Sequence, residues 1–208
     1  MAALKRDSQA QLRLGFAGAA AGLWPSALAR EIRSASADVA VRLVDVGIGA
    51  TTAQLERRLV DVAVLTSPAE FPTGIAHVVL GRSRVVTATP RHPRSIAARS
   101  RDAAQLGRIR LRDVPPDWPS AATDAVPGEE LLADSYDDAL DLVAADSGLF
   151  LTLASCAQRH SREDVVHVPR LDLPEGTVFL SWRTGNNTYA VQACCSAAGD
   201  LIAGRNFD

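Results

Sequence analysis

Hydrophobic residues form three strand-like runs in the first third of the chain, and each run is followed by a turn. The runs are 12–16, 39–46 and 60–65. Between the first two, apolar residues recur at three- to four-residue spacing, which predicts a helix with one buried face. These residues are Leu23, Ala27, Leu28 and Ile32. Because 39–46 is apolar on both faces apart from two charged residues, we expect it to form a buried parallel strand.

Two further signals mark helices in this stretch. Pro25 is expected in the first turn of the first helix, where proline is tolerated. Thr51 and Gln54 have the spacing of a capping box at the start of a second helix, with Leu55 and Leu59 as its buried side. The stretch 12–65 therefore predicts alternating strands and helices with glycine-containing turns.

The second half of the chain continues the alternation after a less regular segment. Residues 94–128 are rich in arginine, proline and alanine, and 115–120 is a proline-rich loop. Ser135, with Asp138 three residues later, predicts another helix start. The remaining predicted strands are 77–80, 84–88, 108–111, 149–153, 165–168 and 177–182, and the remaining helices 154–160 and 189–203.

Several segments, taken in order, resemble the effector-binding domain of LysR-type transcriptional regulators. They are 12–16, 24–41, the run 55–64 ending in Asp-Val-Ala-Val, the Pro-Arg-His-Pro crossing at 90–93, 140–148, and 181–189. The resemblance implies an α/β, two-lobed periplasmic-binding-protein-like (type 2) fold, with mixed sheets flanked by helices and two crossover strands. Residues 12–87 with 183–208 would form lobe I and 88–182 lobe II, and 1–11 would be a linker remnant or disordered arm.

The same resemblance implies how the domain works. A small-molecule effector would bind in the cleft between the lobes, and the closure of the lobes would be transmitted to DNA-binding modules. The chain would form a homodimer, or a tetramer in a full-length regulator. DNA would be contacted only through an N-terminal winged helix-turn-helix, which residues 1–11 are too short to hold. We therefore expect either an excised domain or a chain without DNA binding, and the polar start favours excision.

The effector site is expected at the carboxyl ends of the strands, where open α/β sheets bind small molecules. The candidates from lobe I are Ala17, Gly18, Ala19, Gly47, Ile48, Thr66 and Ser67, and those from lobe II are Trp118, Tyr136 and Asp137. Tight packing, ordinary turn polarity and, for Trp118, burial in the core of lobe II are the alternative explanations. We expect the amides at 17–19 to lie at a helix N-terminus, where they can receive an anion.

Departures from the family pattern bear on the ligand. Ala19 and Ile48 stand where relatives that sense aromatic acids offer hydroxyl groups, and Asp137 would repel an anion. These features favour a neutral, cationic or largely apolar effector. Arg58 replaces the glycine that usually ends the second helix, which implies strain if its φ is positive.

Composition further limits the classes of protein to which the chain can belong. The 208 residues are 47% hydrophobic and 22% charged with a net charge of -2, which is typical of a globular protein and unlike a nucleic-acid-binding domain. There is no secretory signal or membrane span in the sequence, so we expect a cytoplasmic protein. Three cysteines and four scattered histidines give no metal or cofactor pattern, and we expect neither.

We expect no enzyme activity, because the sequence contains no nucleophile elbow, phosphate loop or zinc-protease motif. Cys156 at a helix start is the one candidate nucleophile, and a buried structural thiol is the favoured alternative. The second candidate function is a free-standing small-molecule binding protein without DNA partners.

Overall fold

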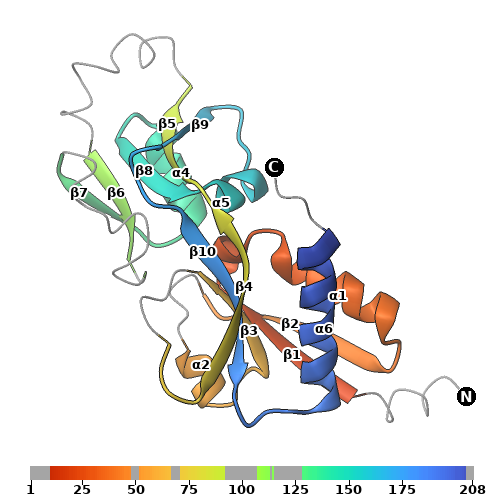
Figure 1. Ribbon diagram of the computed structural model, residues 1–208. Coiled ribbons are helices and arrows are strands. Elements are labelled where there is room, and N and C mark those ends of the chain that lie inside the picture. The colour runs from red at the N-terminus through yellow and green to blue at the C-terminus, as the bar shows by residue number, and fades with distance from the viewer. Residues whose placement is uncertain are drawn as a thin grey trace, which may run out of the picture. The chain divides into compact units, whose positions relative to one another are not determined.

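The computed structural model describes residues 10–47, 52–66, 71–91, 107–112, 114 and 128–204. The chain divides into two compact units (Figure 1). Unit 1 comprises Met1–Gly81 and Thr177–Asp208, and unit 2 comprises Arg82–Gly176. Strand β4 (Ile75–Ser83) runs across the first boundary, and β10 (Gly176–Arg183) begins at the second. The chain thus passes between the units on two strands.

Unit 1 contains a mixed sheet with the strand order β2-β1-β3-β10-β4. The parallel strands β1 (Ala10–Phe16), β2 (Val39–Asp45) and β3 (Val62–Thr66) form one part, and β10 is antiparallel to β3. Helices α1 (Trp24–Ala35) and α6 (Tyr189–Gly204) pack against each other and share one core with the sheet (Figure 1). This core takes alternate strand residues, as a pleated strand dictates: Leu12, Leu14, Val62, Val64, Val178 and Leu180.

The strand prediction for 39–46 was right about pairing and wrong about burial. β2 is parallel to β1, but it is the edge strand of its sheet, and of its residues only Val39 is fully buried. An edge strand has a neighbour on one side only, so its apolar side chains stay partly exposed. Apolar character on both faces therefore did not distinguish a central strand from an edge.

The first two helices begin one or more residues later than the spacing predicted. Pro25 lies in the first turn of α1 as predicted, while Leu23 is the exposed N-cap residue and not part of the buried face.

Helix α2 is shorter than predicted and covers only Ala53–Glu56. Thr52 is its N-cap and makes no side-chain capping bond, and Thr51 lies outside the described residues. Leu59 is 56% exposed because the chain turns sharply at Arg58, so the predicted buried pair is reduced to Leu55.

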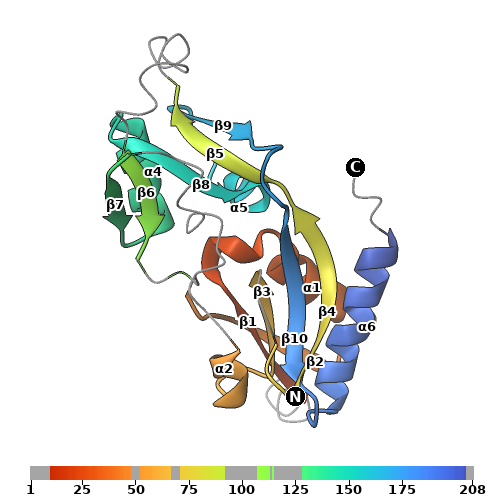
Figure 2. The ribbon, with the colours of Figure 1, turned by 60° about the vertical axis from the view of Figure 1, so that its left-hand side comes forward.

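Unit 2 contains a second mixed sheet, with the order β7-β6-β8-β5-β9. Its strands are β5 (Val85–Pro90), β6 (Gly107–Leu111), β7 (Glu130–Ala133), β8 (Gly148–Leu153) and β9 (Val165–Pro169). Helix α4 (Tyr136–Ala144) packs on β5, β6 and β8, and α5 (Ala154–Arg159) on β8 and β9 (Figure 2). β7, with the short sequence Glu-Leu-Leu-Ala, was not predicted.

The predicted start of α4 is confirmed. The Ser135 hydroxyl accepts a hydrogen bond from the Asp138 amide at 3.1 Å, and the backbone of Ser135 is extended, as an N-cap residue requires. This cap fixes where Tyr136 and Asp137 begin the helix.

Candidate functional site

Three strand ends of unit 1 lie at the same edge of its sheet. Phe16 at the end of β1 pairs with Asp45 at the end of β2 and, on its other side, with Val64 near the end of β3. Because these strands are parallel neighbours, the turns that follow them start side by side. The structure therefore places Ala17, Gly18, Gly47 and Thr66 at or just after neighbouring strand ends, while Ile48 and Ser67 lie outside the described residues. That these residues bind an effector stays a prediction.

The turn after β1 differs from the expected one. The Ala17 amide donates to the Val64 carbonyl at 3.3 Å, and the chain then forms a four-residue 3-10 helix, η1 (Gly18–Ala21), before α1 begins at Trp24. Gly18 has a φ of 50°, in the left-handed region that favours glycine. These amides thus lie at the start of the 3-10 helix η1 and not of α1, and the amide of Ala17 already donates within the sheet. That they receive an anion stays a prediction.

The turn after β2 is closed by a side chain. The Asp45 carboxylate accepts a hydrogen bond from the Gly47 amide at 2.9 Å, a local turn that aspartate commonly forms. Gly47 has a φ of 83°, and a Cβ placed on it would meet no atom of the described chain within 4 Å. The backbone here requires glycine for its conformation, and the space beside it is open among the described residues.

Thr66 is the last residue of β3. It pairs with Val178 of β10, and its side chain is buried within unit 1. A buried threonine at a strand end presents a fixed hydroxyl, whereas an exposed one samples several rotamers. Its role in binding stays a prediction.

In unit 2, Tyr136 packs in the core. It is 6% exposed, and its ring lies edge-on to Phe150 with centroids 5.3 Å apart and tilted against His160 at 4.5 Å. Its hydroxyl is buried and makes no hydrogen bond of standard geometry among the described residues. Burial raises the pKa of Tyr136 well above its usual value, and the nearby Thr152 hydroxyl opposes that shift only in part. The ring is thus a core residue, and a ligand contact for it remains a prediction; Trp118 lies outside the described residues.

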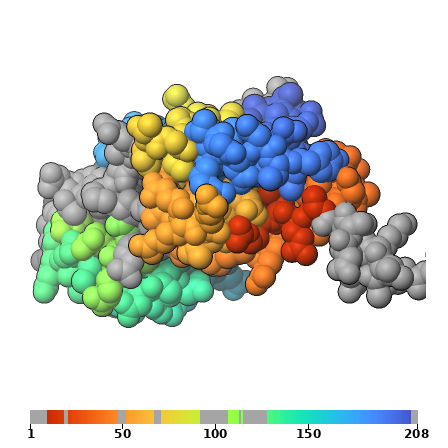
Figure 3. All heavy atoms as spheres, turned by 90° about the horizontal axis from the view of Figure 1, so that it is seen from below, coloured from red at the N-terminus to blue at the C-terminus, as the bar shows by residue number. Residues whose placement is uncertain are grey.

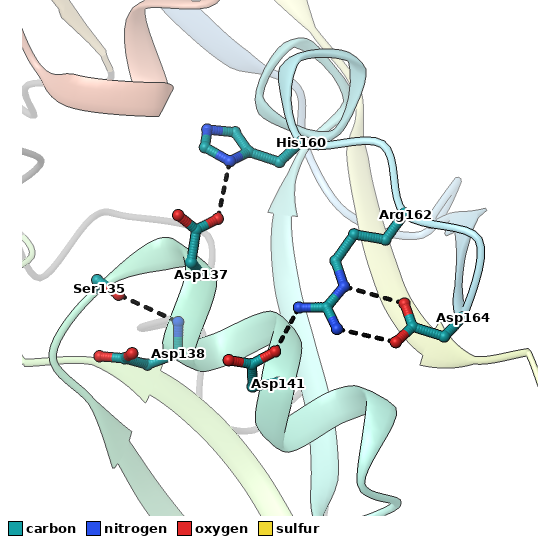
Figure 4. A network of polar contacts seen from close by, with 7 residues as sticks. All are labelled: Ser135, Asp137, Asp138, Asp141, His160, Arg162 and Asp164. Atoms are coloured by element: carbon teal, nitrogen blue, oxygen red, sulfur yellow. Dashed lines mark hydrogen bonds and ion pairs between the residues drawn. The ribbon is translucent and has the colours of Figure 1, made fainter.

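The acidic residues of α4 have partners that the sequence did not reveal (Figure 4). Asp137 faces the His160 ring nitrogen at 3.1 Å, and Asp141 pairs with the Arg162 guanidinium at 2.5 Å. Arg162 also binds Asp164 at 2.8 and 2.9 Å, which holds the pKa of that carboxyl below its usual range. Arg162 thus compensates part of the negative charge of α4, so α4 alone is weak evidence against an anionic effector. No local spacing signals these contacts, because Arg162 is 21 residues from Asp141.

The candidate nucleophile is unsuited to catalysis. Cys156 is fully buried, and burial raises its pKa to about 11, so the thiol is protonated at neutral pH. Within the described ranges, no group of three or more His, Cys, Asp or Glu side chains is arranged to hold a metal ion. Nor does any helix in that part of the chain combine the length and the apolarity needed to cross a membrane.

Comparisons with known proteins agree on one family. A family model described as the LysR substrate binding domain matches residues 5–201. No curated protein matches the sequence significantly. Among solved structures, the chain is similar to the BenM effector binding domain with its effector benzoate, at 21% identity and a TM-score of 0.73, with 93% of this chain and 92% of that chain covered.

Two further structures show the same likeness. The reduced OxyR regulatory domain from Pseudomonas aeruginosa is 16% identical with a TM-score of 0.71, covering 95% of this chain and 99% of that one. Full-length CbnR complexed with target DNA is 14% identical with a TM-score of 0.71, covering 97% of this chain and 74% of that one. At such identities the likeness establishes the fold: mixed sheets flanked by helices in the two-lobed, type 2 periplasmic-binding-protein-like arrangement.

Proposed function

This chain belongs to the LysR substrate binding domain family, and from that premise we propose that it senses a small-molecule effector at the carboxyl ends of β1, β2 and β3. The contacts proposed in unit 1 are Ala17, Gly18, Ala19, Gly47, Ile48, Thr66 and Ser67. Trp118, Tyr136 and Asp137 are the further contacts proposed from unit 2.

One observation supports this placement above the others. The ends of three parallel strands are adjacent in register, and the turns after two of them contain glycines at φ 50° and 83°. Such turns let a ligand approach the backbone closely, since no Cβ stands in the way. The open space beside Gly47 supports the same position.

The proposed effector is neutral, cationic or largely apolar. Ala19 and Ile48 cannot offer a hydroxyl to a carboxylate, and the Ala17 and Gly47 amides already donate to Val64 and Asp45. A carboxylate placed at these turns would therefore find few donors, and burying it without partners is costly.

A thermal-shift screen with neutral metabolites, amines and aromatic acids tests the proposal, followed by calorimetry on each hit. Ile48→Asp and Gly18→Val are expected to weaken binding, and Thr66→Val to weaken it for ligands that accept or donate a hydrogen bond. Thr184→Val is the matched control, because this exposed threonine follows the opposite end of β10. Unchanged affinity in both Ile48→Asp and Gly18→Val variants that remain folded would refute the site.

We further propose that the chain acts as a regulatory and not a catalytic domain, as a homodimer in the cytoplasm, and reports effector binding to DNA-binding modules on the same polypeptide. Family membership supports this proposal. Codons for a helix-turn-helix directly upstream of Met1 in the same reading frame are expected. A demonstrated translation start at Met1 would contradict the DNA-linked role and favour a free-standing small-molecule binding protein.

A further inference from the structure

A pocket in unit 1 is lined by two arginines. Its lining residues are Arg58, Arg183, Gly185 and Asn186, and its volume is about 370 Å³. Arg58 follows α2, and the other three lie at or just after the end of β10. On the face drawn in Figure 3, the segment around α2, in orange, adjoins the segment after β10, in blue. The pocket is of the size of a small-molecule site.

Arg58 holds its position against a conformational penalty. Its φ of 58° lies in the left-handed region, where a side chain other than glycine is strained. The preceding residue, Arg57, has an ordinary φ of -74°. Among the described residues, the Arg58 guanidinium has no hydrogen bond or ion pair, although it lines the pocket. The positive φ itself belongs to the end of α2, where the Leu59 amide donates to the Gln54 carbonyl at 3.0 Å. Arg58 is exposed, so its guanidinium is accessible to an anion at the pocket.

Arg183 is the second cation of the pocket. Its Nε is buried and has no hydrogen-bond partner among the described atoms. Its charge helps to lower the pKa of Asp61. However, the Asp61 carboxylate is held by the Arg13 guanidinium at 2.7 and 3.1 Å, so that charge is already paired. Within the part of the chain that the structure describes, neither guanidinium of the pocket makes an ion pair, although Arg183 feels the charge of Asp61.

We propose that this pocket is a binding site for a phosphate-sized oxyanion, either inorganic phosphate or the phosphate group of a metabolite. Guanidinium groups bind such anions through paired N–H donors with matching geometry. Asn186 adds an amide group whose bond to the Asp61 carbonyl is long, at 3.5 Å. The site is separate from the strand-end site: Thr66 pairs with Val178, and Arg183 lies five residues further along β10, about 16 Å at the rise of a strand.

Calorimetry with inorganic phosphate tests this site, with sodium chloride as the control titrant at matched ionic strength. The unaltered chain is expected to bind phosphate saturably at one site, and chloride is expected to give no such signal. Arg58→Gly and Arg183→Gln are each expected to weaken phosphate binding by about tenfold or more. Arg57→Gln removes the neighbouring charge outside the pocket lining and is expected to stay within about twofold of the unaltered chain.

Arg58→Gly also separates binding from folding. Because glycine adopts a positive φ without strain, this variant is expected to unfold at the same temperature as the unaltered chain or a higher one. Loss of phosphate binding together with undiminished stability supports the site, even if Arg183→Gln fails to fold. A flat phosphate titration of the unaltered chain, or an Arg58→Gly variant that binds phosphate as tightly as the parent, would overturn it. Methyl phosphate in place of phosphate distinguishes the two sources: equal affinity indicates a phosphate ester, and loss of affinity the free ion.

Discussion

The ion pair between Arg13 and Asp61 is expected to be a main stabilising contact of unit 1. The Asp61 carboxylate accepts two hydrogen bonds from the Arg13 guanidinium, at 2.7 and 3.1 Å, and a third from the Arg13 amide at 2.8 Å. In return, the Asp61 amide donates to the Arg13 carbonyl at 2.9 Å. The pair therefore ties β1 to the residue that precedes β3. Asp61→Asn removes the charge and keeps the shape.

The magnitude follows from the burial of the pair. The Asp61 side chain is 19% exposed and that of Arg13 is 40% exposed. Exposed ion pairs contribute at most about 1 kcal/mol, and breaking a fully buried pair costs about 3–5 kcal/mol. Because the carboxylate is mostly buried and the guanidinium is half-exposed, we expect Asp61→Asn to lower the free energy of unfolding by about 2 kcal/mol, between those limits.

The effect should depend on pH in a defined direction. Burial alone would raise the pKa of Asp61, but the hydrogen bonds from the Arg13 side chain and amide outweigh it, so the pKa lies below its usual value. A carboxyl whose pKa is lower in the folded state stabilises that state above its unfolded pKa of about 4, and this stabilisation disappears as the pH falls through the lowered value. The difference between Asp61→Asn and the parent should thus be full at pH 7 and smaller below about pH 4.

Urea denaturation at pH 7 and at pH 3.5 measures both quantities. Asp172→Asn is the control, since Arg170 binds that carboxylate at 2.7 and 2.9 Å and its pKa is lowered to about 2, yet the side chain is 62% exposed. We expect this control to change stability much less, because water screens an exposed pair. Equal losses for the two substitutions, or an Asp61→Asn loss that is the same at both pH values, would refute the assignment of the stability to a buried charge.

Three further predictions concern unit 2, and each is checked by thermal or chemical unfolding. Ser135→Ala removes the cap on the Asp138 amide and should lower the free energy of unfolding by about 1 kcal/mol, and Ser135→Asp should restore most of that loss. An alanine variant as stable as the parent would contradict the cap. Gly148→Ala should cost about 2 kcal/mol or more, because the added Cβ would lie 2.5 Å from the Gly107 carbonyl oxygen; a neutral result would show that β6 and β8 can separate. Tyr136→Phe should leave stability within about 0.5 kcal/mol of the parent, since the buried hydroxyl makes no hydrogen bond of standard geometry among the described residues. A large loss would show that the hydroxyl has a partner that stabilises the fold.

Local patterns predicted the elements that depend on local chemistry. The cap at Ser135 and the position of Pro25 in α1 both involve atoms within a few residues of each other, so their spacing is visible in the sequence. The three strands of the 12–65 stretch were found for the same reason, since their apolar runs are bounded by turns.

Features that depend on distant residues were missed or wrongly placed. β2 would be a central strand if another strand paired with its outer side, and its own sequence does not show whether one does. The Arg13 and Asp61 pair joins residues 48 apart, and the pocket arginines are further apart still. The conformation of Arg58 was predicted in part. The family pattern has glycine at this position, and the φ of 58° agrees with the strain expected for another residue there.

The strand-end site shows how a position can be predicted more firmly than its chemistry. Register places the three turns together, and that follows from parallel pairing alone. The donors at those turns are a separate matter, and the Ala17 and Gly47 amides are used by the protein itself. An effector bound there, as we propose, would be recognised mainly by side chains at the turns. Among the described residues the polar side chains at these turns are the buried Thr66 hydroxyl and the Asp45 carboxylate, which already accepts a hydrogen bond from the Gly47 amide. A ligand that needs a single hydrogen bond and a large apolar contact fits this arrangement better than one that needs a cradle of amides.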